Sequence, residues 1–502
     1  FGDYVSGNIW SLRRVGPTVD VQRVAGEAGI TAFGTDPSNR DILAVDYADG
    51  RILRVVNGTN DIGSFPQWLS ETGLFADLSD LSPAPGVLPY APNLAFWSDH
   101  AIKRRWFVIP DGVSRMTWSR DDPWTFPDGT IMIKHFDLES ERGNSNTARR
   151  IETRLLVKNS NGCYGVSYRW NNAQTDAQLV PDAGVTFPTN ILVGGMTNVQ
   201  QYRIPSRAEC LACHTPQAGH VLSFDTRQLN RTTSMNGFVG NQISLLGAGG
   251  FFNNPHQSPN LLPRHLRPDE ISYPVESRVR SYLAVNCANC HRAGGTAGPS
   301  WDGRSELTLE ATGLINGPAV QNGGNPANQL VVPGDTFHSI VLNRVAVSNG
   351  FTRMPPLGST ELDQQNIALL IEWINQSQSS WDTYDDWRMA WFGDLVSPDG
   401  EPTADPDGDG RSNNEEWLAG TDPLDGNLYF RSTIAVSNNQ VRLGMTLPTN
   451  RSVMVETSTN LVDWSLWDVP GNQGLPLPGG PWWIDGPADD LLRYFRFWIR
   501  EN

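Results

Sequence analysis

Hydrophobic and polar positions alternate in three parts of the chain, and alternation with a period of two predicts β-strands. The first part, at the N-terminus, has strand candidates at residues 8–12, 41–45 and 51–56. The second has longer candidates at residues 104–109, 130–136, 153–157 and 164–170. The third has candidates at residues 441–445, 452–456 and 493–498. We therefore expect a β-rich N-terminal part and a small C-terminal β-sandwich.

Between these parts the pattern has the period of a helix. In residues 276–286, Val279, Tyr282 and Leu283 fall on one helical face. Residues 363–376 form a second candidate, with Ser359 or Thr360 as its expected N-cap. Its apolar positions follow the i, i+3, i+4, i+7 pattern, at Ile367, Leu370, Ile371 and Ile374. The chain as a whole is therefore predicted to be multidomain α+β.

A chain of 502 residues is too long for one hydrophobic core. Changes of pattern divide it into six segments: 1–57, 58–205, 206–275, 276–382, 383–426 and 427–502. The net charge of −16 argues against nucleic acids and anionic membrane surfaces as partners. No run of 18 apolar residues is present, so the sequence predicts no membrane span.

Two pentapeptides carry the strongest chemical signal: Cys210-Leu211-Ala212-Cys213-His214 and Cys287-Ala288-Asn289-Cys290-His291. Each is a Cys-x-x-Cys-His sequence, the pattern of covalent c-type haem attachment. Two thiols at this spacing can each bond one vinyl group of the same porphyrin, and the adjacent histidine becomes the proximal iron ligand. A thioredoxin-type pair needs no such histidine, and a zinc knuckle is the weaker reading for two sites. We therefore expect two covalent haem c groups, with His214 and His291 as iron ligands.

The fifth cysteine, Cys163, has no partner if the other four hold haem, and we expect a buried, unreactive thiol. Haem c is attached outside the cytoplasm. The sequence therefore predicts an exported precursor, a chain that begins after a processing or truncation point, and a periplasmic or extracellular location.

The sixth iron ligand is better defined for the second haem than for the first. Met354 lies 63 residues after His291 and just before the last helix, where small cytochromes c place a distal methionine. Met/His ligation raises the reduction potential. The first haem has no obvious distal ligand, and the candidates are His100, His135, Met196, His220, Met235 and His256. An open iron at this haem is the alternative.

A calcium loop is predicted at residues 405–416. Asp405, Asp407, Asp409 and Glu416 occupy positions 1, 3, 5 and 12 of an EF-hand-type loop, and Gly410 permits its sharp turn. In such a loop the Arg411 carbonyl and the Asn413 side chain are further ligands. A single loop between domains suggests a structural cation, and the competing reading is an acidic linker.

Several motifs resemble one family of proteins: Phe96-Trp97-Ser98-Asp99, Phe126-Pro127-Asp128-Gly129-Thr130, Glu152-Thr153-Arg154 and Tyr168-Arg169-Trp170-Asn171. With the two haem motifs, they resemble exported dihaem c-type cytochromes that are often fused to a glucose/sorbosone-dehydrogenase-like propeller. The likeness covers about residues 60–380, and residues 1–57 resemble the last blade of such a propeller. The calcium loop and its continuation to Pro423 resemble thrombospondin-type-3-like repeats.

The resemblance implies mainly α-helical cytochrome c domains and electron transfer, with a redox partner protein that is a donor dehydrogenase or an acceptor cytochrome. The donor suggested by the propeller-like segment is a sugar or alcohol dehydrogenase. Two alternatives remain: a dihaem peroxidase or oxidase with an open first iron, and an extracellular binding or scaffold protein. No Ser-His-Asp pattern, phosphate loop or dinucleotide fingerprint is present, so no catalytic residue is assigned. The sequence does not define the oligomeric state.

Overall fold

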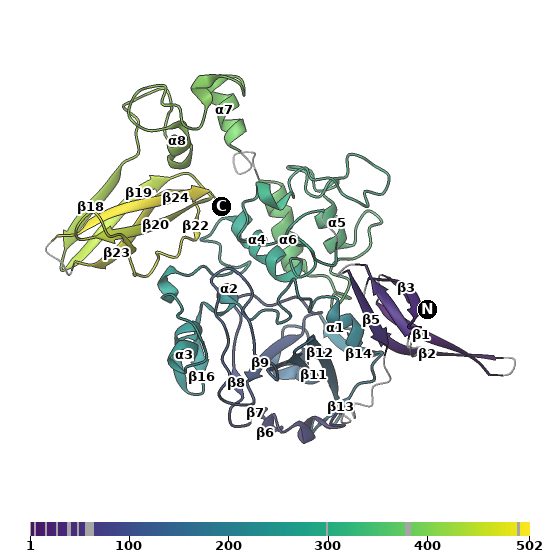
Figure 1. Ribbon diagram of the computed structural model, residues 1–502. Coiled ribbons are helices and arrows are strands. Elements are labelled where there is room, and N and C mark those ends of the chain that lie inside the picture. Colours follow the sequence, from purple (N-terminus) through teal and green to yellow (C-terminus); the bar gives the residue numbers. More distant parts are fainter. Residues whose placement is uncertain are drawn as a thin grey trace.

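The computed structural model describes residues 2–4, 7–15, 18–26, 29–37, 42–47, 50–55, 65–297, 300–376, 383–488 and 492–501. Figure 1 shows a β-rich part below, a helical part at the centre and two C-terminal sheets to one side. The fold mixes strands and helices, as the sequence predicts. Among the described residues, none of the helices is long and apolar enough to cross a bilayer.

The N-terminal strands form two small sheets. The strands are β1 (Asn8–Val15), β2 (Thr18–Gly26), β3 (Ile30–Thr35), β4 (Ile42–Asp46) and β5 (Arg51–Val55). β1 pairs with β2, and β3, β4 and β5 form a separate sheet. Ile9, Ile30 and Ala44 make their small shared core. Several other apolar side chains of this segment, such as Ile52, are exposed.

A six-stranded antiparallel sheet, here called the central sheet, dominates the β-rich part. Its order is β13-β12-β11-β10-β9-β8. The strands are β8 (Leu88–Pro89), β9 (Ile102–Val108), β10 (Ile131–Glu139), β11 (Ala148–Asn159), β12 (Gly162–Trp170) and β13 (Ala177–Leu179). All four strands predicted between residues 104 and 170 lie in it.

Each face of the central sheet is covered by a different hydrophobic cluster. Trp106, Ile133 and Leu155 belong to the cluster on one face. This cluster also contains buried apolar side chains between Leu69 and Val87. On the other face, Phe107 and Met132 pack with Phe224 and other residues of 221–262. The remaining strands of this part are β6 (Phe75–Asp77), β7 (Ser82–Pro83), β14 (Val185–Val193) and β15 (Met196–Ile204), and two 3-10 turns lie at Leu69–Thr72 and Ser145–Thr147.

Residues 206–275 contain short helices and a hairpin. The helices are α1 (Arg207–Leu211), α2 (Thr226–Leu229) and α3 (Gln242–Ala248), the hairpin strands are β16 (Thr232–Met235) and β17 (Phe238–Asn241), and Pro259–Leu261 is a 3-10 turn. α1 lies against β12 of the central sheet. This segment thus packs on the sheet through its apolar side chains and contains no helix longer than seven residues.

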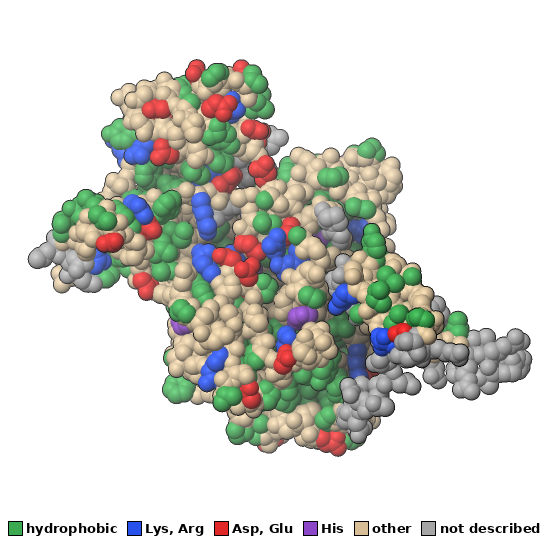
Figure 2. Space-filling view, in the orientation of Figure 1, with side chains coloured by type: hydrophobic (Ala, Val, Ile, Leu, Met, Phe, Trp, Pro, Cys, Tyr) green, Lys and Arg blue, Asp and Glu red, His purple; other side chains and the backbone are tan. Residues whose placement is uncertain are grey.

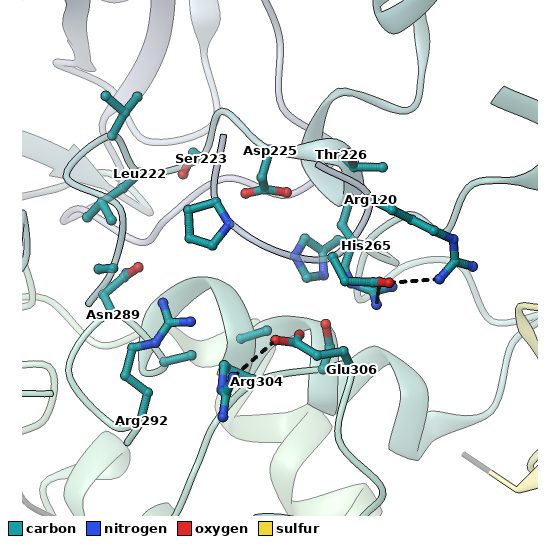
Figure 3. A pocket seen from close by; sticks show the side chains of 18 residues that line it. Arg120, Leu222, Ser223, Asp225, Thr226, His265, Asn289, Arg292, Arg304 and Glu306 are labelled. Atoms are coloured by element: carbon teal, nitrogen blue, oxygen red, sulfur yellow. Dashed lines mark hydrogen bonds and ion pairs between the residues drawn. The ribbon is translucent and has the colours of Figure 1, made fainter. Parts of the chain in front are cut away.

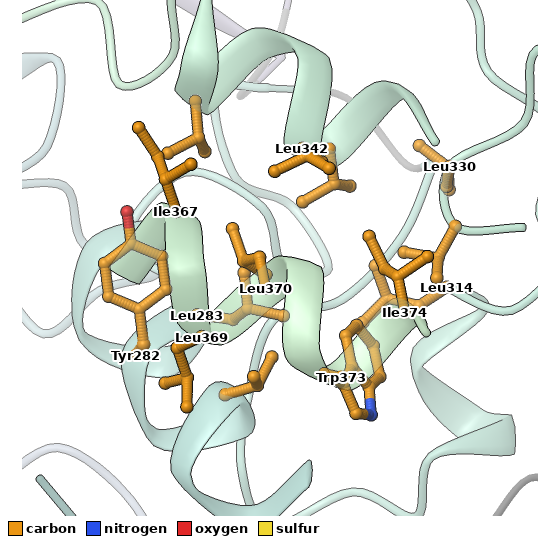
Figure 4. Close-up of a cluster of buried hydrophobic side chains, with 14 of the residues drawn as sticks. Tyr282, Leu283, Leu314, Leu330, Leu342, Ile367, Leu369, Leu370, Trp373 and Ile374 are labelled. Atoms are coloured by element: carbon orange, nitrogen blue, oxygen red, sulfur yellow. The ribbon is translucent and has the colours of Figure 1, made fainter. Parts of the chain in front are cut away.

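The helical part is built from α4 (Val275–Asn286), α5 (Ile340–Ala346) and α6 (Gln364–Ile374), with a 3-10 turn at Glu310–Thr312. α4 packs against α6, and both contribute to one core around Leu283, Leu370 and Trp373 (Figure 4). The N-cap expected at Ser359 or Thr360 was wrong. Asp363 caps α6, since its carboxylate accepts a hydrogen bond from the Asn366 N–H, and the Thr360 hydroxyl donates instead to the Gln201 carbonyl.

After residue 383 the chain forms a small helical lobe and then two antiparallel sheets. The lobe contains α7 (Tyr384–Phe392), a 3-10 turn at Pro398–Gly400 and α8 (Asn413–Ala419), and acidic side chains gather on its surface (Figure 2). One sheet consists of β18 (Ser432–Ser437), β19 (Gln440–Leu447) and β23 (Gly480–Pro487). The other consists of β20 (Arg451–Ser458), β21 (Ser465–Leu466), β22 (Pro476–Leu477) and β24 (Tyr494–Glu501). Residues of both sheets, including Leu443 and Val455, share a core.

Candidate functional site

The second Cys-x-x-Cys-His motif is a tight turn at the end of α4. The Cys287 N–H still bonds to the Leu283 carbonyl, and the N–H groups of Cys290 and His291 both donate to the Cys287 carbonyl. The helix is fixed by its packing against α6. The two thiols and the imidazole are therefore carried on one short turn with a rigid support.

His291 lies flat against an aromatic ring. Its imidazole stacks on Trp301, with ring centroids 4.5 Å apart. Gly303 donates its N–H to the His291 carbonyl, and a Cβ at Gly303 would lie only 3.1 Å from the Trp301 ring. Burial, and then the Arg344 charge, lowers the pKa of His291 to about 4. The imidazole is therefore neutral at physiological pH, the form that binds a metal.

Arg344 on α5 is hydrogen-bonded to Met354, and its charge also acts on His291. The Arg344 carbonyl accepts a hydrogen bond from the Met354 N–H, and its guanidinium donates to the carbonyl and hydroxyl of Thr352. The same residue carries the charge that lowers the pKa of His291. The half-buried Met354 is thus held on a loop that is tied to α5.

The first motif begins in the last turn of α1, a short helix with a capping box. The Ser206 hydroxyl accepts from the Glu209 N–H, and the Glu209 carboxylate accepts from the Ser206 N–H. His214 donates from Nδ1 to the His220 carbonyl at 2.6 Å. Because a carbonyl can only accept, Nδ1 carries the proton and Nε2 keeps its lone pair for a metal. Burial lowers the pKa of His214 to about 4.

The central sheet lies directly beneath this first motif. Gly165 on β12 approaches Cys210 so closely that a Cβ there would lie 3.1 Å from the sulfur. Cys163 on the same strand lies 3.6 Å, measured from Sγ, from the His214 carbonyl oxygen. Burial raises the pKa of the Cys163 thiol to about 11, so this cysteine stays protonated and weakly nucleophilic at neutral pH.

The two motifs touch each other. The Cys290 thiol donates to the Ala212 carbonyl with 3.5 Å between Sγ and O, and the Thr296 hydroxyl donates to the same carbonyl at 3.1 Å. A hydrogen bond between the thiols of Cys213 and Cys290 raises the pKa of Cys213. The fold therefore brings together two groups of ligands that are more than 70 residues apart in the sequence.

The six residues that are candidates for the distal iron ligand of the first haem lie in different surroundings. Both ring nitrogens of the buried His135 are engaged, with Thr153 at 2.8 Å and Asp137 at 3.0 Å. Met235 is part of a hydrophobic core, and Met196 is 70 % exposed at a hairpin tip. The other three candidates have contacts of their own: His220 with Gly162 and Cys163, His256 with Phe252, and His100 with Trp97.

A cavity of about 100 Å³ separates the second motif from the segment that follows the first (Figure 3). Ala288, Asn289 and Arg292 line it from one side and Leu222 and Asp225 from the other. His265, which belongs to none of the sequence motifs, also lines it. Its Nδ1 is buried and, within the described parts of the chain, has no hydrogen-bond partner. Burial lowers the pKa of His265 to about 3, so its ring is neutral.

The acidic loop at residues 405–416 gathers its carboxylates around one point. Oxygen atoms of Asp405, Asp407 and Asp409 lie within 4.8 Å of one another. Glu416 is 1 % exposed, and its Oε2 has no hydrogen-bond partner in the described structure. Burial, with the three aspartates nearby, raises the pKa of Glu416 to about 7. Asn413 places a buried, unbonded Oδ1 in the same loop, whereas the exposed Arg411 side chain pairs with Glu415.

Helices of this arrangement, with a Cys-x-x-Cys-His turn at the end of the first one, define a cytochrome c domain. Residues 274–374 match the family described as cytochrome c oxidase, cbb3-type, subunit III. The chain thus contains a c-type cytochrome domain, a class that carries covalent haem, transfers electrons and requires a redox partner. Comparison with curated proteins and with solved structures gives no match.

Proposed function

We propose that the chain is a dihaem c-type cytochrome that relays electrons between two neighbouring haems. Cys210 and Cys213 would attach one haem with His214 as its proximal ligand. Cys287, Cys290 and His291 would do the same for the other. The observation that carries the proposal is the contact between the motifs, where the Cys290 thiol bonds to the Ala212 carbonyl.

The residues present suit a haem at each motif. Both histidines have depressed pKa values, so each offers a neutral imidazole. The hydrogen bond from His214 Nδ1 fixes the tautomer that directs Nε2 to a metal. Trp301 would orient the His291 ring by stacking. Bound haem iron supplies one-electron chemistry, and the protein contributes the attachment, the axial ligands and the surrounding charge.

Met354 is the proposed distal ligand of the second haem. Its loop is tied to α5 through Arg344, the residue whose charge also reaches His291. A thioether ligand opposite histidine raises the potential of the iron. The second haem would then be the electron acceptor of the pair and pass electrons to a partner.

The cellular setting follows from the chemistry of haem attachment, which takes place outside the cytoplasm. We place the protein in the periplasm or the extracellular space. Its partner would be a redox protein, either a donor dehydrogenase or an acceptor cytochrome. With a net charge of −16, the protein would favour a partner surface rich in lysine and arginine.

The loop at 405–416 is proposed to bind Ca²⁺ through Asp405, Asp407, Asp409 and Glu416, with Arg411 and Asn413 as the remaining ligands of the loop. The supporting observation is the buried, unbonded Oε2 of Glu416 beside three aspartates. A divalent cation would neutralise this cluster and stiffen the connection between the helical part and the C-terminal sheets.

Mass spectrometry of the denatured protein tests the central proposal. Two covalent haems should be added to the polypeptide mass, and Cys210→Ala/Cys213→Ala should remove one of them. Cys163→Ala is the matched control and should retain both. A wild-type mass with a single haem would overturn the dihaem relay while leaving the cytochrome c domain intact.

A further inference from the structure

Three cations lie side by side on the face of the central sheet that supports α1. Lys134 on β10 is paired in register with Arg105 on β9 and with Arg154 on β11. Directly paired residues of antiparallel strands point to the same face, so the three side chains form one row. The neighbouring positions Met132 and Phe136 on β10 are apolar and buried. The row is therefore a cationic band, bordered on one side by Met132 and on the other by Phe136, whose cross-strand partners are Lys103 and Glu152.

Among the described residues, two of these cations form no ion pair, although Glu152 lies close enough to attract Lys134. Arg154 forms a two-pronged ion pair with Glu152, at 2.6 and 2.8 Å. Arg105 is 5 % exposed, and its Nη2 is buried without a hydrogen-bond partner among the described residues. The ammonium group of Lys134 lies over the rings of Phe96 and Phe136, at 5.6 and 5.1 Å from their centroids. Buried charges are costly unless they are paired, so this band requires an anion.

The first Cys-x-x-Cys-His motif faces the same band. Cys210 touches Gly165, which lies on the same face of the sheet as Arg154. Gly165 pairs with Leu156, two residues from Arg154 on β11, so the Cys210 thiol and the cation row lie close together on one face of the sheet.

Haem c brings two anions of its own. The thioether bonds fix one edge of the porphyrin to the protein, and the two propionate carboxylates extend from another edge. We propose that Arg105, Lys134 and Arg154 form the site that binds the propionates of the first haem. This inference rests on the proposed attachment of haem at Cys210 and Cys213. Guanidinium and ammonium groups are the donors that bind carboxylates most strongly in a buried setting.

The test compares single variants of the full-length, haem-loaded protein. Lys134→Met and Arg105→Met each remove one charge and keep much of the side-chain bulk, and Lys134→Arg restores the charge. Arg104→Met is the matched control. Arg104 precedes Arg105 on β9 but points to the opposite face, where it is 41 % exposed and pairs with Asp137.

Two measurements are needed, a spectroelectrochemical titration and the resonance Raman bands of propionate bending. Loss of a cation near the iron disfavours the ferrous state. We expect Lys134→Met and Arg105→Met each to lower the reduction potential of one haem by about 59 mV. For one electron this is a tenfold shift of the reduction equilibrium. The propionate bands of that haem should shift too. Lys134→Arg and Arg104→Met should behave like the wild type.

The outcomes separate this inference from the proposal on which it rests. If mass spectrometry finds no haem at Cys210 and Cys213, both fail. If both haems are bound and the propionate bands of Lys134→Met and Arg105→Met match those of the wild type, only the propionate site is wrong. Conversion of one haem to a high-spin spectrum in Lys134→Met would identify the lysine as an axial ligand and would also overturn it. If Lys134→Met does not fold, Arg105→Met decides by the same bands.

Discussion

The Cys290 thiol donates a hydrogen bond to the carbonyl of Ala212, across 3.5 Å between Sγ and O. Ala212 lies within the first Cys-x-x-Cys-His motif, and Cys290 is the second cysteine of the other. The contact thus joins two turns that come from different parts of the fold, one on the central sheet and one at the end of α4. Haems attached to these turns would be neighbours, and their charges would interact.

Interaction between the two haems should be visible in a redox titration. An electron on one haem disfavours a second electron on the other, because like charges repel more strongly in a low-dielectric interior. In the wild type we expect the two steps to spread over a wider potential range than two independent one-electron curves. In Cys210→Ala/Cys213→Ala the remaining haem should follow a simple one-electron curve at a shifted midpoint. An unchanged midpoint for that haem would show that the two sites do not communicate.

Met354→Ala should affect one haem only. Loss of the thioether ligand should abolish a methionine–iron charge-transfer band and lower the potential of the second haem, because Met/His ligation raises it. Met389→Ala, which truncates a 46 % exposed methionine on α7, is the control and should change neither signal. If the band and both potentials survive in Met354→Ala, Met354 serves only in packing.

The strands of the central sheet could be predicted because they are short runs rich in apolar and aromatic residues, such as Trp106 and Phe107, which pack in the clusters on opposite faces. The apolar stripe of α6 was equally clear, although its cap was misplaced. Four hydroxyl or carboxyl side chains precede the helix, at Ser359, Thr360, Glu361 and Asp363. The Ser359 and Thr360 hydroxyls donate to the carbonyls of Pro355 and Gln201, and Asp363 makes the cap. Local patterns thus defined the elements, while long-range contacts defined their ends.

The arrangement of the candidate site could not be read from local patterns. The contact between Cys290 and Ala212 depends on how α4 and α1 pack on different supports. Lys134 did carry a signal, since it interrupts the apolar alternation of Met132 and Phe136 and is one of only three lysines in the chain. A charged residue on the buried face of a predicted strand is a useful pointer to a bound anion.

Calcium should stabilise the region around the 405–416 loop. A cation at 100 times its dissociation constant adds about 2.7 kcal/mol to the free energy of unfolding. We expect a chelator to lower the unfolding temperature of the wild type, and Glu416→Gln to lose most of that response. Glu415→Gln is the control, because Glu415 caps α8 through Ser412 and belongs to a different set of contacts. Equal chelator responses in the wild type and Glu416→Gln would leave the loop as an acidic linker.

Glu276 should make stability fall as the pH rises through neutrality. This residue of α4 is 2 % exposed, and its Oε1 accepts a hydrogen bond from Asn450 at 3.0 Å, so it joins the helical part to the C-terminal sheets, which lie beside α4 in Figure 1. Burial raises the pKa of Glu276 from 4.5 to about 7. Between these values the folded protein binds more protons than the unfolded chain, so the contribution is complete below pH 4.5 and is lost as the pH rises through 7.

Glu276→Gln keeps an oxygen that accepts from Asn450 but cannot ionise, and it therefore isolates this effect. In calcium-loaded protein, urea unfolding should give similar free energies for the wild type and Glu276→Gln near pH 5. Near pH 8.5 the variant should be more stable by on the order of 3 kcal/mol, the free energy that corresponds to the pKa shift. Glu372→Gln, which alters a 57 % exposed carboxylate on α6, should follow the wild-type curve. Parallel curves for the wild type and Glu276→Gln from pH 5 to 8.5 would mean that the Glu276 carboxyl is ionised in the folded protein across this range.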